Sequence, residues 1–165
     1  MKHTGTRRKS GSKESLADKE NTTADALETI VALRSSGGGE HTPTVTEVIE
    51  KVRNGLRFQD LETLQRLLDV PMEQLAAKLG ISRATLHRRK IAGRLETDES
   101  DKVMRYARLV RQAIDVFGSI EDARSWMTHP QFGLGNVTPL EYAQTEIGAR
   151  EVENLLGRIE YGVYS

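Results

Sequence analysis

From Thr44 to the end of the chain, apolar residues recur at helical intervals, and this pattern constrains the fold more than any other feature. Side chains three and four residues apart lie on one face of an α-helix, whereas a half-buried strand needs strict alternation of apolar and polar residues. No stretch sustains such alternation for more than a few residues. One helical stripe contains Leu61, Leu64, Leu67 and Leu68. We therefore predict an all-α protein.

Signals for helix ends divide this part of the chain into successive helices. Gly55 and Gly118 follow apolar stripes at the position where a left-handed C-cap residue is favoured. Ser119 and the pair Thr138–Pro139 are typical N-terminal signals, because a hydroxyl caps the first turn and proline fits the first helical position. Outside the segment 71–90, helices are predicted at about 44–54, 59–69, 98–117, 119–127, 138–141 and 146–159.

The first 43 residues differ in composition from the rest and are predicted to be mostly disordered. Residues 1–23 contain a single leucine among many Ser, Thr, Lys and Arg residues. Residues 23–36 are treated as a conditional helix that Gly37–Gly39 would end. Its apolar side consists of Ala26, Leu27, Ile30, Val31 and Leu33. No Gly-Lys-Ser/Thr follows the three glycines, so they are interpreted as a linker rather than a phosphate-binding loop.

The segment PMEQLAAKLGISRATLHRR, residues 71–89, has the spacing of a helix-turn-helix. In such a unit two helices cross at a tight turn, which suits the glycine at 80 and the small side chain of Ala76. Ser82 is expected to cap the second helix through its hydroxyl. Apolar contacts between the two helices are expected from Leu75, Leu79, Ile81 and Leu86.

The second helix of this unit carries a basic face that can reach base edges and phosphates in the major groove of DNA. The candidate DNA contacts are Ser82, Arg83, Thr85, His87, Arg88, Arg89, Lys90 and Arg94. The alternative is an ordinary αα-corner whose basic residues form a solvated face. Arg89 favours that alternative, because helix-turn-helix proteins often keep an apolar residue at this position. In a helix-turn-helix, Ile91 or Leu95 would supply this apolar packing in place of residue 89.

Charge is distributed unevenly although the formal net charge of the chain is zero. Residues 82–94 contain five Lys or Arg residues and no acidic residue, whereas residues 95–165 carry a net charge of −5 from twelve acidic and seven basic residues. A basic patch followed by an acidic region indicates two different partners. A single helix-turn-helix binds DNA weakly, so DNA binding implies a homodimer that reads two half-sites.

Several classes of protein and of site are disfavoured by composition. No stretch has the roughly 18 consecutive apolar residues of a membrane span, and no secretory signal is recognisable, so we expect a cytoplasmic protein without membrane contact. The chain has no cysteine, which excludes disulfides and thiolate metal sites. Its four histidines are scattered, without metal-ligand spacing. We identify no catalytic residues and no metal site, and we expect no cofactor.

Residues 45–165 resemble the Xre/MbcA/ParS antitoxins, which join an Xre-like helix-turn-helix to a C-terminal toxin-binding domain. The resemblance is carried by GISRATLHRRK, by LETDESDKVMRYARL, and by Trp126 together with FGLGNVTPLEYAQTEIGAREVENLLGRIEYGVYS. It implies three regions: a mostly disordered extension at 1–43, a helix-turn-helix domain at 44–97 and a toxin-binding domain at 98–165. The extension lies outside the resemblance.

The resemblance also implies a function. A member of this family is a type II antitoxin that neutralises a RES-domain toxin, which depletes NAD, and that represses its own operon by binding operator DNA. In the family the end of the chain obstructs the active-site cleft of the toxin. Carried over to this sequence, the toxin contacts are Arg158, Glu160, Tyr161, Gly162, Val163, Tyr164 and Ser165.

Two questions stay open at the level of the sequence. Tyr161 and Tyr164 are either anchors for a partner, as large rigid rings often are, or a cover for the last helix of their own chain. Trp126 is likewise either a core residue or an interface anchor. An alternative function is a helix-turn-helix transcriptional regulator whose C-terminal domain serves only for dimerisation.

Overall fold

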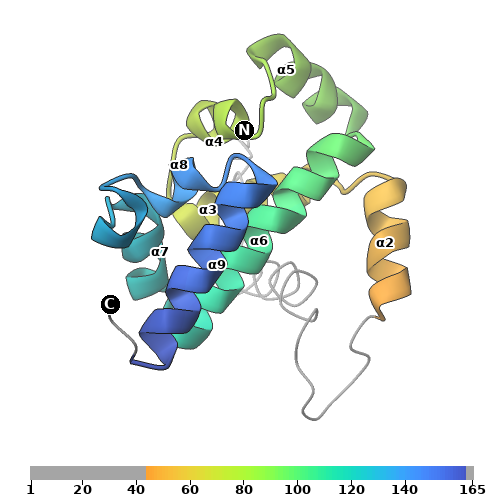
Figure 1. The fold of residues 1–165 in the computed structure, drawn as a ribbon. Helices are drawn as coiled ribbons and strands as arrows, with labels where there is room; N and C mark the ends of the chain where they lie inside the picture. Colours follow the sequence, from red (N-terminus) through yellow and green to blue (C-terminus); the bar gives the residue numbers. More distant parts are fainter. Residues whose placement is uncertain (1–43, 163–165) are drawn as a thin grey trace, which may run out of the picture.

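The computed structural model describes residues 44–162, which form helices α2 to α9 and one short 3-10 helix (Figure 1). No strand occurs within these residues, where isolated β-bridges pair Arg57 with Arg94 and Gln131 with Val137. The all-α prediction is confirmed. The elements are α2 (Val45–Arg53), α3 (Phe58–Leu68), α4 (Met72–Lys78), α5 (Arg83–Ala92), α6 (Thr97–Phe117), α7 (Ile120–Thr128), η1 (Phe132–Leu134), α8 (Pro139–Tyr142) and α9 (Glu146–Glu160).

The helix ends lie where the capping signals predicted them. The hydroxyl of Ser119 accepts a hydrogen bond from the backbone N–H of Asp122 at 3.1 Å, and Thr138 caps α8 with Pro139 in the first turn. Gly118 ends α6 with φ of +81°, in the left-handed region that glycine enters without steric cost. Local hydrogen bonding therefore sets these boundaries, which is why the sequence could predict them.

Helix α6 is the central element, and helices from both ends of the described chain pack on it (Figure 1). Leu61 and Leu64 of α3 are fully buried, as are Val103 and Leu109 of α6. Val152 and Leu156 complete the same apolar core from α9. The predicted domain boundary, between residues 97 and 98, falls inside the first turn of α6. This helix contacts α2 and α3, which precede the boundary, and α7 and α9, which follow it.

Polar contacts also join the two parts of the chain. Arg124 of α7 donates through Nε to the carbonyl oxygen of Leu67 at 2.8 Å, and so satisfies the C-terminal end of α3. Lys78 of α4 lies 3.6 Å from the carboxylate of Glu141 in α8. Tyr106, which is buried in α6, donates from its hydroxyl to the carbonyl oxygen of Leu140 at 3.0 Å. The helix-turn-helix and the C-terminal helices are therefore parts of one packed unit.

The connections around the helix-turn-helix are held to one another by backbone hydrogen bonds. The N–H of Leu95 donates to the carbonyl oxygen of Leu56, and the N–H of Phe58 donates to that of Gly93, both at 2.9 Å. Gly55 has φ of +79°, and a Cβ atom there would lie 2.1 Å from the carbonyl oxygen of Leu95. Only glycine fits so close an approach, so this position fixes how the segment entering α3 meets the segment leaving α5.

Candidate functional site

Helices α4 and α5 form the predicted helix-turn-helix. Gly80 lies in the turn with φ of +71°, and the N–H of Ile81 donates to the carbonyl oxygen of Ala76 at 2.8 Å. The hydroxyl of Ser82 accepts from the N–H of Thr85 at 3.2 Å, which confirms the predicted cap. The apolar contacts are also as expected: Leu75, Leu79 and Ile81 are buried and Leu86 is half-buried.

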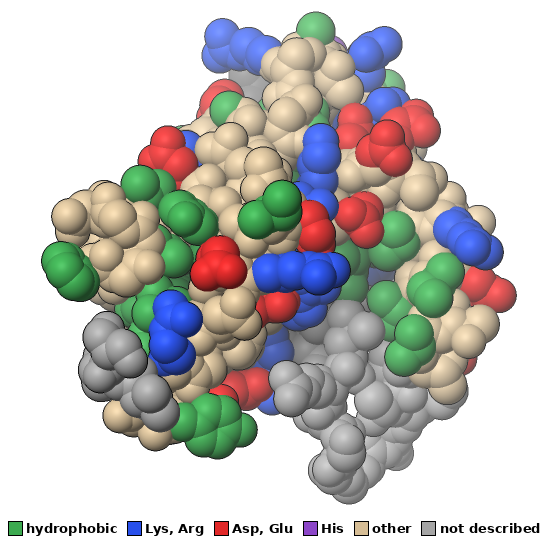
Figure 2. All heavy atoms as spheres, viewed as in Figure 1, with side chains coloured by type: hydrophobic (Ala, Val, Ile, Leu, Met, Phe, Trp, Pro, Cys, Tyr) green, Lys and Arg blue, Asp and Glu red, His purple; other side chains and the backbone are tan. Residues whose placement is uncertain are grey.

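Most of the predicted DNA contacts lie on the outer surface of α5. Arg83, His87, Arg88 and Lys90 are exposed, and none of the four forms an ion pair within residues 44–162. Figure 2 shows Lys and Arg side chains at the outer end of the molecule, where α5 lies. The Thr85 hydroxyl is half-buried and accepts from a guanidinium nitrogen of Arg88 at 3.1 Å. This surface carries positive charge that no carboxylate in the described part of the chain neutralises.

Two of the predicted DNA contacts, Arg89 and Arg94, instead bind groups of their own chain. Arg89 donates through Nε to Glu99 at 2.8 Å and lies 3.0 Å from Glu96. The hydrogen bond to Glu99 raises the pKa of Arg89 above its ordinary value, with the negative charges of Glu99 and Glu96 acting in the same direction. Arg94 donates to the carbonyl oxygens of Asn54 and Gly55 at 3.2 and 2.9 Å. Arg89 therefore holds α5 to the start of α6, and Arg94 holds the segment after α5 to the turn after α2.

The position of Arg89 also resolves the packing question raised by the sequence. Leu95 is buried and Ile91 is 75% exposed, so Leu95 supplies the apolar packing and Ile91 does not. An ion pair between α5 and α6 takes the place of the apolar contact that was expected at Arg89. The basic face is therefore narrower than the sequence suggested.

The predicted toxin contacts follow the C-terminal end of α9. Arg158 and Glu160 are exposed on its last turns, and Gly162 has φ of +67°. The side chain of Tyr161 is 80% exposed, so this ring does not cover the last helix of its own chain. Val163, Tyr164 and Ser165 lie outside the described residues.

A further exposed ring, which the sequence analysis did not single out, lies beside this end of the molecule. Phe132 is 91% exposed, although the turn that carries it is well held. The N–H of Gln131 donates to the carbonyl oxygen of Val137 at 3.1 Å, and its side-chain amide donates to those of Trp126 and His129 at 3.0 Å. An exposed aromatic ring on a rigid turn is a typical interface anchor, because little freedom is lost when it is buried.

The turn that carries Phe132 rests on α9. A Cβ atom at Gly133 would lie 2.9 Å from Cδ1 of Leu155, so η1 packs closely against the side chain of Leu155. Tyr161 lies six residues beyond Leu155, which corresponds to about 9 Å along a helix. Figure 2 shows hydrophobic side chains over α7 and near the C-terminal end of α9. Phe132 and Tyr161 are thus two exposed rings in the C-terminal part of the described chain.

Trp126 serves a different purpose from either exposed ring. It is half-buried against the core, and its ring lies 5.6 Å from that of Phe117, at an interplanar angle of 39°. Such tilted aromatic pairs stabilise packing beyond the area they bury. These contacts agree better with the interpretation of Trp126 as a core residue than with that of an interface anchor.

Residues 44–162 hold no group of three or more His, Asp or Glu side chains placed to bind a metal ion. Within the same range, every helix is too short or too polar to cross a membrane.

Matches to known protein families include both the helix-turn-helix and the C-terminal helices. Residues 47–108 match the antitoxin Xre-like helix-turn-helix domain, and residues 112–162 match the antitoxin Xre/MbcA/ParS C-terminal toxin-binding domain. A protein of Yersinia enterocolitica named "Antitoxin Xre" is 33% identical over 122 residues, which are 73% of this chain and 82% of that protein.

Two further relatives extend this picture. A protein of Photorhabdus laumondii, also named "Antitoxin Xre", is 45% identical over 74 residues, or 44% of this chain and 50% of its own length. A Sphingobium protein named "Prs ADP-ribosylating antitoxin" is 26% identical over 124 residues, or 69% of this chain and 78% of its own length. Phe132 and Tyr161 both fall within the region that matches the toxin-binding domain.

Proposed function

This chain belongs to the Xre/MbcA/ParS family of antitoxins, and from that premise we propose how its two surfaces act. As a type II antitoxin it binds a toxin through its C-terminal helices and DNA through its helix-turn-helix. We assign the toxin to the RES-domain class and the DNA to the operator of the shared operon. In this proposal the protein is an inhibitor and repressor, not an enzyme.

The observation that carries the toxin assignment is the exposure of Tyr161 directly after α9. A ring exposed at the end of a rigid helix can enter a cleft without unfolding anything, so binding costs little conformational entropy. Gly162 allows the following residues to turn close to the partner. Arg158 and Glu160 would supply polar contacts in a cleft built for a charged dinucleotide such as NAD.

Phe132 extends this proposed surface away from the cleft. The ring lies on a turn that packs on Leu155, in the C-terminal half of α9. In our proposal Phe132 anchors the antitoxin on the body of the toxin, while Tyr161 and the residues after it obstruct the active site. A core of aromatic anchors with polar groups at the rim is the usual anatomy of such interfaces.

The assignment of an NAD-consuming toxin rests on the family resemblance and on one relative. The name of the Sphingobium protein joins an antitoxin with ADP-ribosylation, a reaction in which NAD supplies the ADP-ribose. A cleft that accepts NAD has to bind phosphates and sugars, which agrees with a C-terminal segment that carries both charges as well as rings.

For the DNA surface we propose that Arg83, His87, Arg88 and Lys90 face the operator, with the N-terminal end of α5 in the major groove. Ser82 and Thr85 would contribute hydroxyl contacts from the first turn. Two copies of the chain would read two half-sites, because one unit alone binds weakly. Arg89 and Arg94 act indirectly in this scheme, by holding α5 in position.

The proposal is tested by expressing the toxin from the neighbouring reading frame with variants of this chain, and by measuring cell survival and NAD. Removal of residues 160–165 should abolish protection while helix content and operator binding stay unchanged. Phe132→Ala should weaken the toxin complex by about tenfold or more, as expected for an interface anchor. Arg88→Ala is the matched control, because it should reduce operator binding and leave protection intact.

Full protection by the truncated chain would contradict the blocking mechanism. If the neighbouring frame is not toxic and the chain still binds its operator as a dimer, the regulator interpretation replaces the antitoxin mechanism proposed for this chain.

A further inference from the structure

Helix α2 has an apolar face that the described part of the chain covers only in part: Val48 and Val52 are half-buried, and Val45 and Ile49 are exposed. None of its residues is buried, and Val45 is 72% exposed. Its apolar residues, Val45, Val48, Ile49 and Val52, have the spacing of a single helical face. A helix of nine residues gains most of its stability from packing of such a face, since short helices are marginal on their own in water. We therefore expect a further segment to cover the exposed part of the apolar face of α2.

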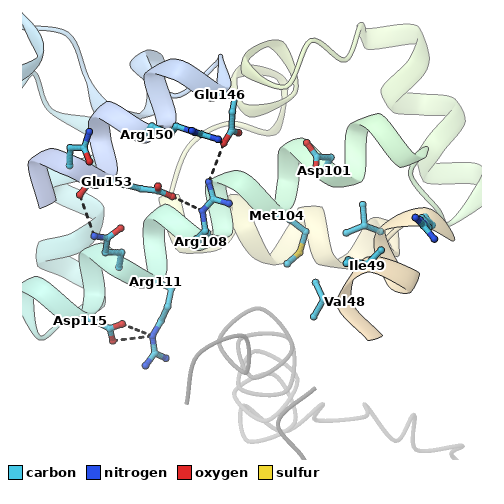
Figure 3. Close-up of a pocket in the computed structure, with 14 residues that line it drawn as sticks. Val48, Ile49, Asp101, Met104, Arg108, Arg111, Asp115, Glu146, Arg150 and Glu153 are labelled. Carbon is cyan, nitrogen blue, oxygen red and sulfur yellow. Dashed lines mark hydrogen bonds and ion pairs between the residues drawn. The ribbon is translucent and has the colours of Figure 1, made fainter. Parts of the chain in front are cut away.

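A groove of about 1120 Å³ lies between α2, α6 and α9. Val48 and Ile49 point into it from α2, opposite Met104 of α6 (Figure 3). Charged residues line the rest of the groove, and several of them form ion pairs with one another. Arg108 binds Glu153 and Glu146, and Arg111 binds Asp115. The groove therefore offers an apolar strip with largely neutralised borders, which fits an amphipathic helix better than a charged ligand.

We propose that residues 23–36 of the same chain occupy this groove as a short helix. These residues lie outside the described part of the structure. In sequence they are the apolar part of the first 43 residues, and Leu27, Ile30 and Val31 have the i, i+3, i+4 spacing of one helical face. Two such faces, on residues 23–36 and on α2, bury each other when the helices pack side by side.

The length of the connection favours residues of the same chain over a second copy. The stretch from Leu33 to Val45 spans about 40 Å when extended, and α2 itself is only about 14 Å long. Gly37–Gly39 lets the chain reverse its direction within that connection. A short tether of this kind gives an effective concentration in the millimolar range, so even a weak apolar contact would form within one chain.

Docking in the groove would stabilise the contacts that hold the segment after α5 to the end of α2. The last residues of α2 and the turn after it present carbonyl oxygens to the segment that follows α5: Thr97 donates to Arg53, and Arg94 donates to Asn54 and Gly55. A segment that covers the apolar face of α2 would hold these acceptors in place. This inference concerns the antitoxin's own chain and does not depend on the identity of the toxin or the operator.

The absence of cysteine from the chain allows a direct test by disulfide formation in the full-length protein. Ile30→Cys combined with Val48→Cys places one thiol on the proposed docking face and one in the groove. Mild oxidation should give mainly a disulfide within one chain, which migrates as a monomer on a non-reducing gel. The control pair, Ile30→Cys with Glu50→Cys, places the second thiol on the exposed outer side of α2 and should react at least tenfold more slowly.

Three results would overturn the proposal. These are no disulfide in the first pair, equal rates in the two pairs, and a disulfide that links two chains, which would assign the groove to a second copy. Ile30→Asp against Ala32→Asp gives a second measurement without cysteine. Amide hydrogen exchange in α2 should be about tenfold faster in Ile30→Asp, whereas Ala32→Asp, on the opposite side of the predicted helix, should match the parent protein. Equal exchange in all three proteins would exclude docking of this face.

Discussion

The guanidinium of Arg89 on α5 donates through Nε to both carboxylate oxygens of Glu99 on α6, at 3.1 and 2.8 Å. The neighbouring Arg88 is exposed and donates to the hydroxyl of Thr85 in its own helix. The sequence predicted DNA contact for both of these adjacent arginines, but their surroundings in the fold differ. One attaches the recognition helix to the core helix, and the other presents its charge to solvent.

Arg88→Ala should weaken operator binding by about tenfold at moderate salt, because an exposed basic contact to the DNA is lost. The slope of log affinity against log salt should fall by about one if the contact is to phosphate. Fluorescence anisotropy with operator DNA at several salt concentrations measures both quantities. Unchanged affinity together with an unchanged slope would show that Arg88 does not face the DNA.

Arg89→Ala should lower the melting temperature of the free protein, in contrast to Arg88→Ala. The variant leaves the carboxylate of Glu99 without the guanidinium that now accompanies it between α5 and α6. A double-mutant cycle with Glu99→Ala checks the cause, since the two changes together should cost less than the sum of each alone. Additive effects on thermal unfolding would mean that the ion pair contributes no coupling.

Two glycines of α9 should respond in opposite directions to substitution by alanine. A Cβ atom at Gly148 would lie 1.8 Å from the carbonyl oxygen of Tyr142, so Gly148→Ala has to push α8 away from α9. At Gly157 no atom of the described residues would lie within 4 Å of the added carbon, and alanine has the higher helix propensity. We expect Gly148→Ala to destabilise the protein by about 2 kcal/mol or more and Gly157→Ala to stabilise it by up to about 1 kcal/mol. Urea unfolding measures both changes, and a tolerated Gly148→Ala would be inconsistent with the packing of α8 on α9.

Stability should decline at alkaline pH because of Tyr106. Burial raises the pKa of its hydroxyl to about 12, above the ordinary value of 10.0 that applies in the unfolded chain. Between these values the unfolded state releases the proton while the folded state keeps it, so rising pH favours unfolding. The loss should reach about 1–3 kcal/mol by pH 12 and be absent below pH 10. Urea unfolding of Tyr106→Phe gives the background, and an equal pH slope in both proteins would exclude this cause.

The helices and their ends could be predicted because they depend on neighbours in the sequence. The hydroxyls of Ser82 and Ser119 cap their helices through hydrogen bonds to residues three positions later. The apolar stripes predict which face of each helix is buried. The turn of the helix-turn-helix is equally local. Each of these features follows from spacings of three or four residues.

The roles of individual surface residues depend on contacts across the fold and could not be read in the same way. Arg89 meets Glu99 only because α5 folds back on α6, and Arg94 reaches carbonyl oxygens some forty residues earlier in the chain. Phe132 looks like an ordinary apolar residue in sequence, and only the fold shows that its side chain is exposed. A helical wheel of α5 could have separated Arg88 from Arg89, which lie about 100° apart, but not have identified the side that faces α6.

The position of α6 between the two halves limits how the chain can be divided. Leu109 and Val110 are buried within α6, and this helix contacts α2 and α3, which precede it, as well as α7 and α9, which follow it. A recombination junction placed inside α6 would therefore separate groups that have to fit each other, and each fragment would present apolar surface to water. New combinations of operator and toxin specificity are more readily reached by substitutions on α5 and around Phe132 than by exchange of half-chains.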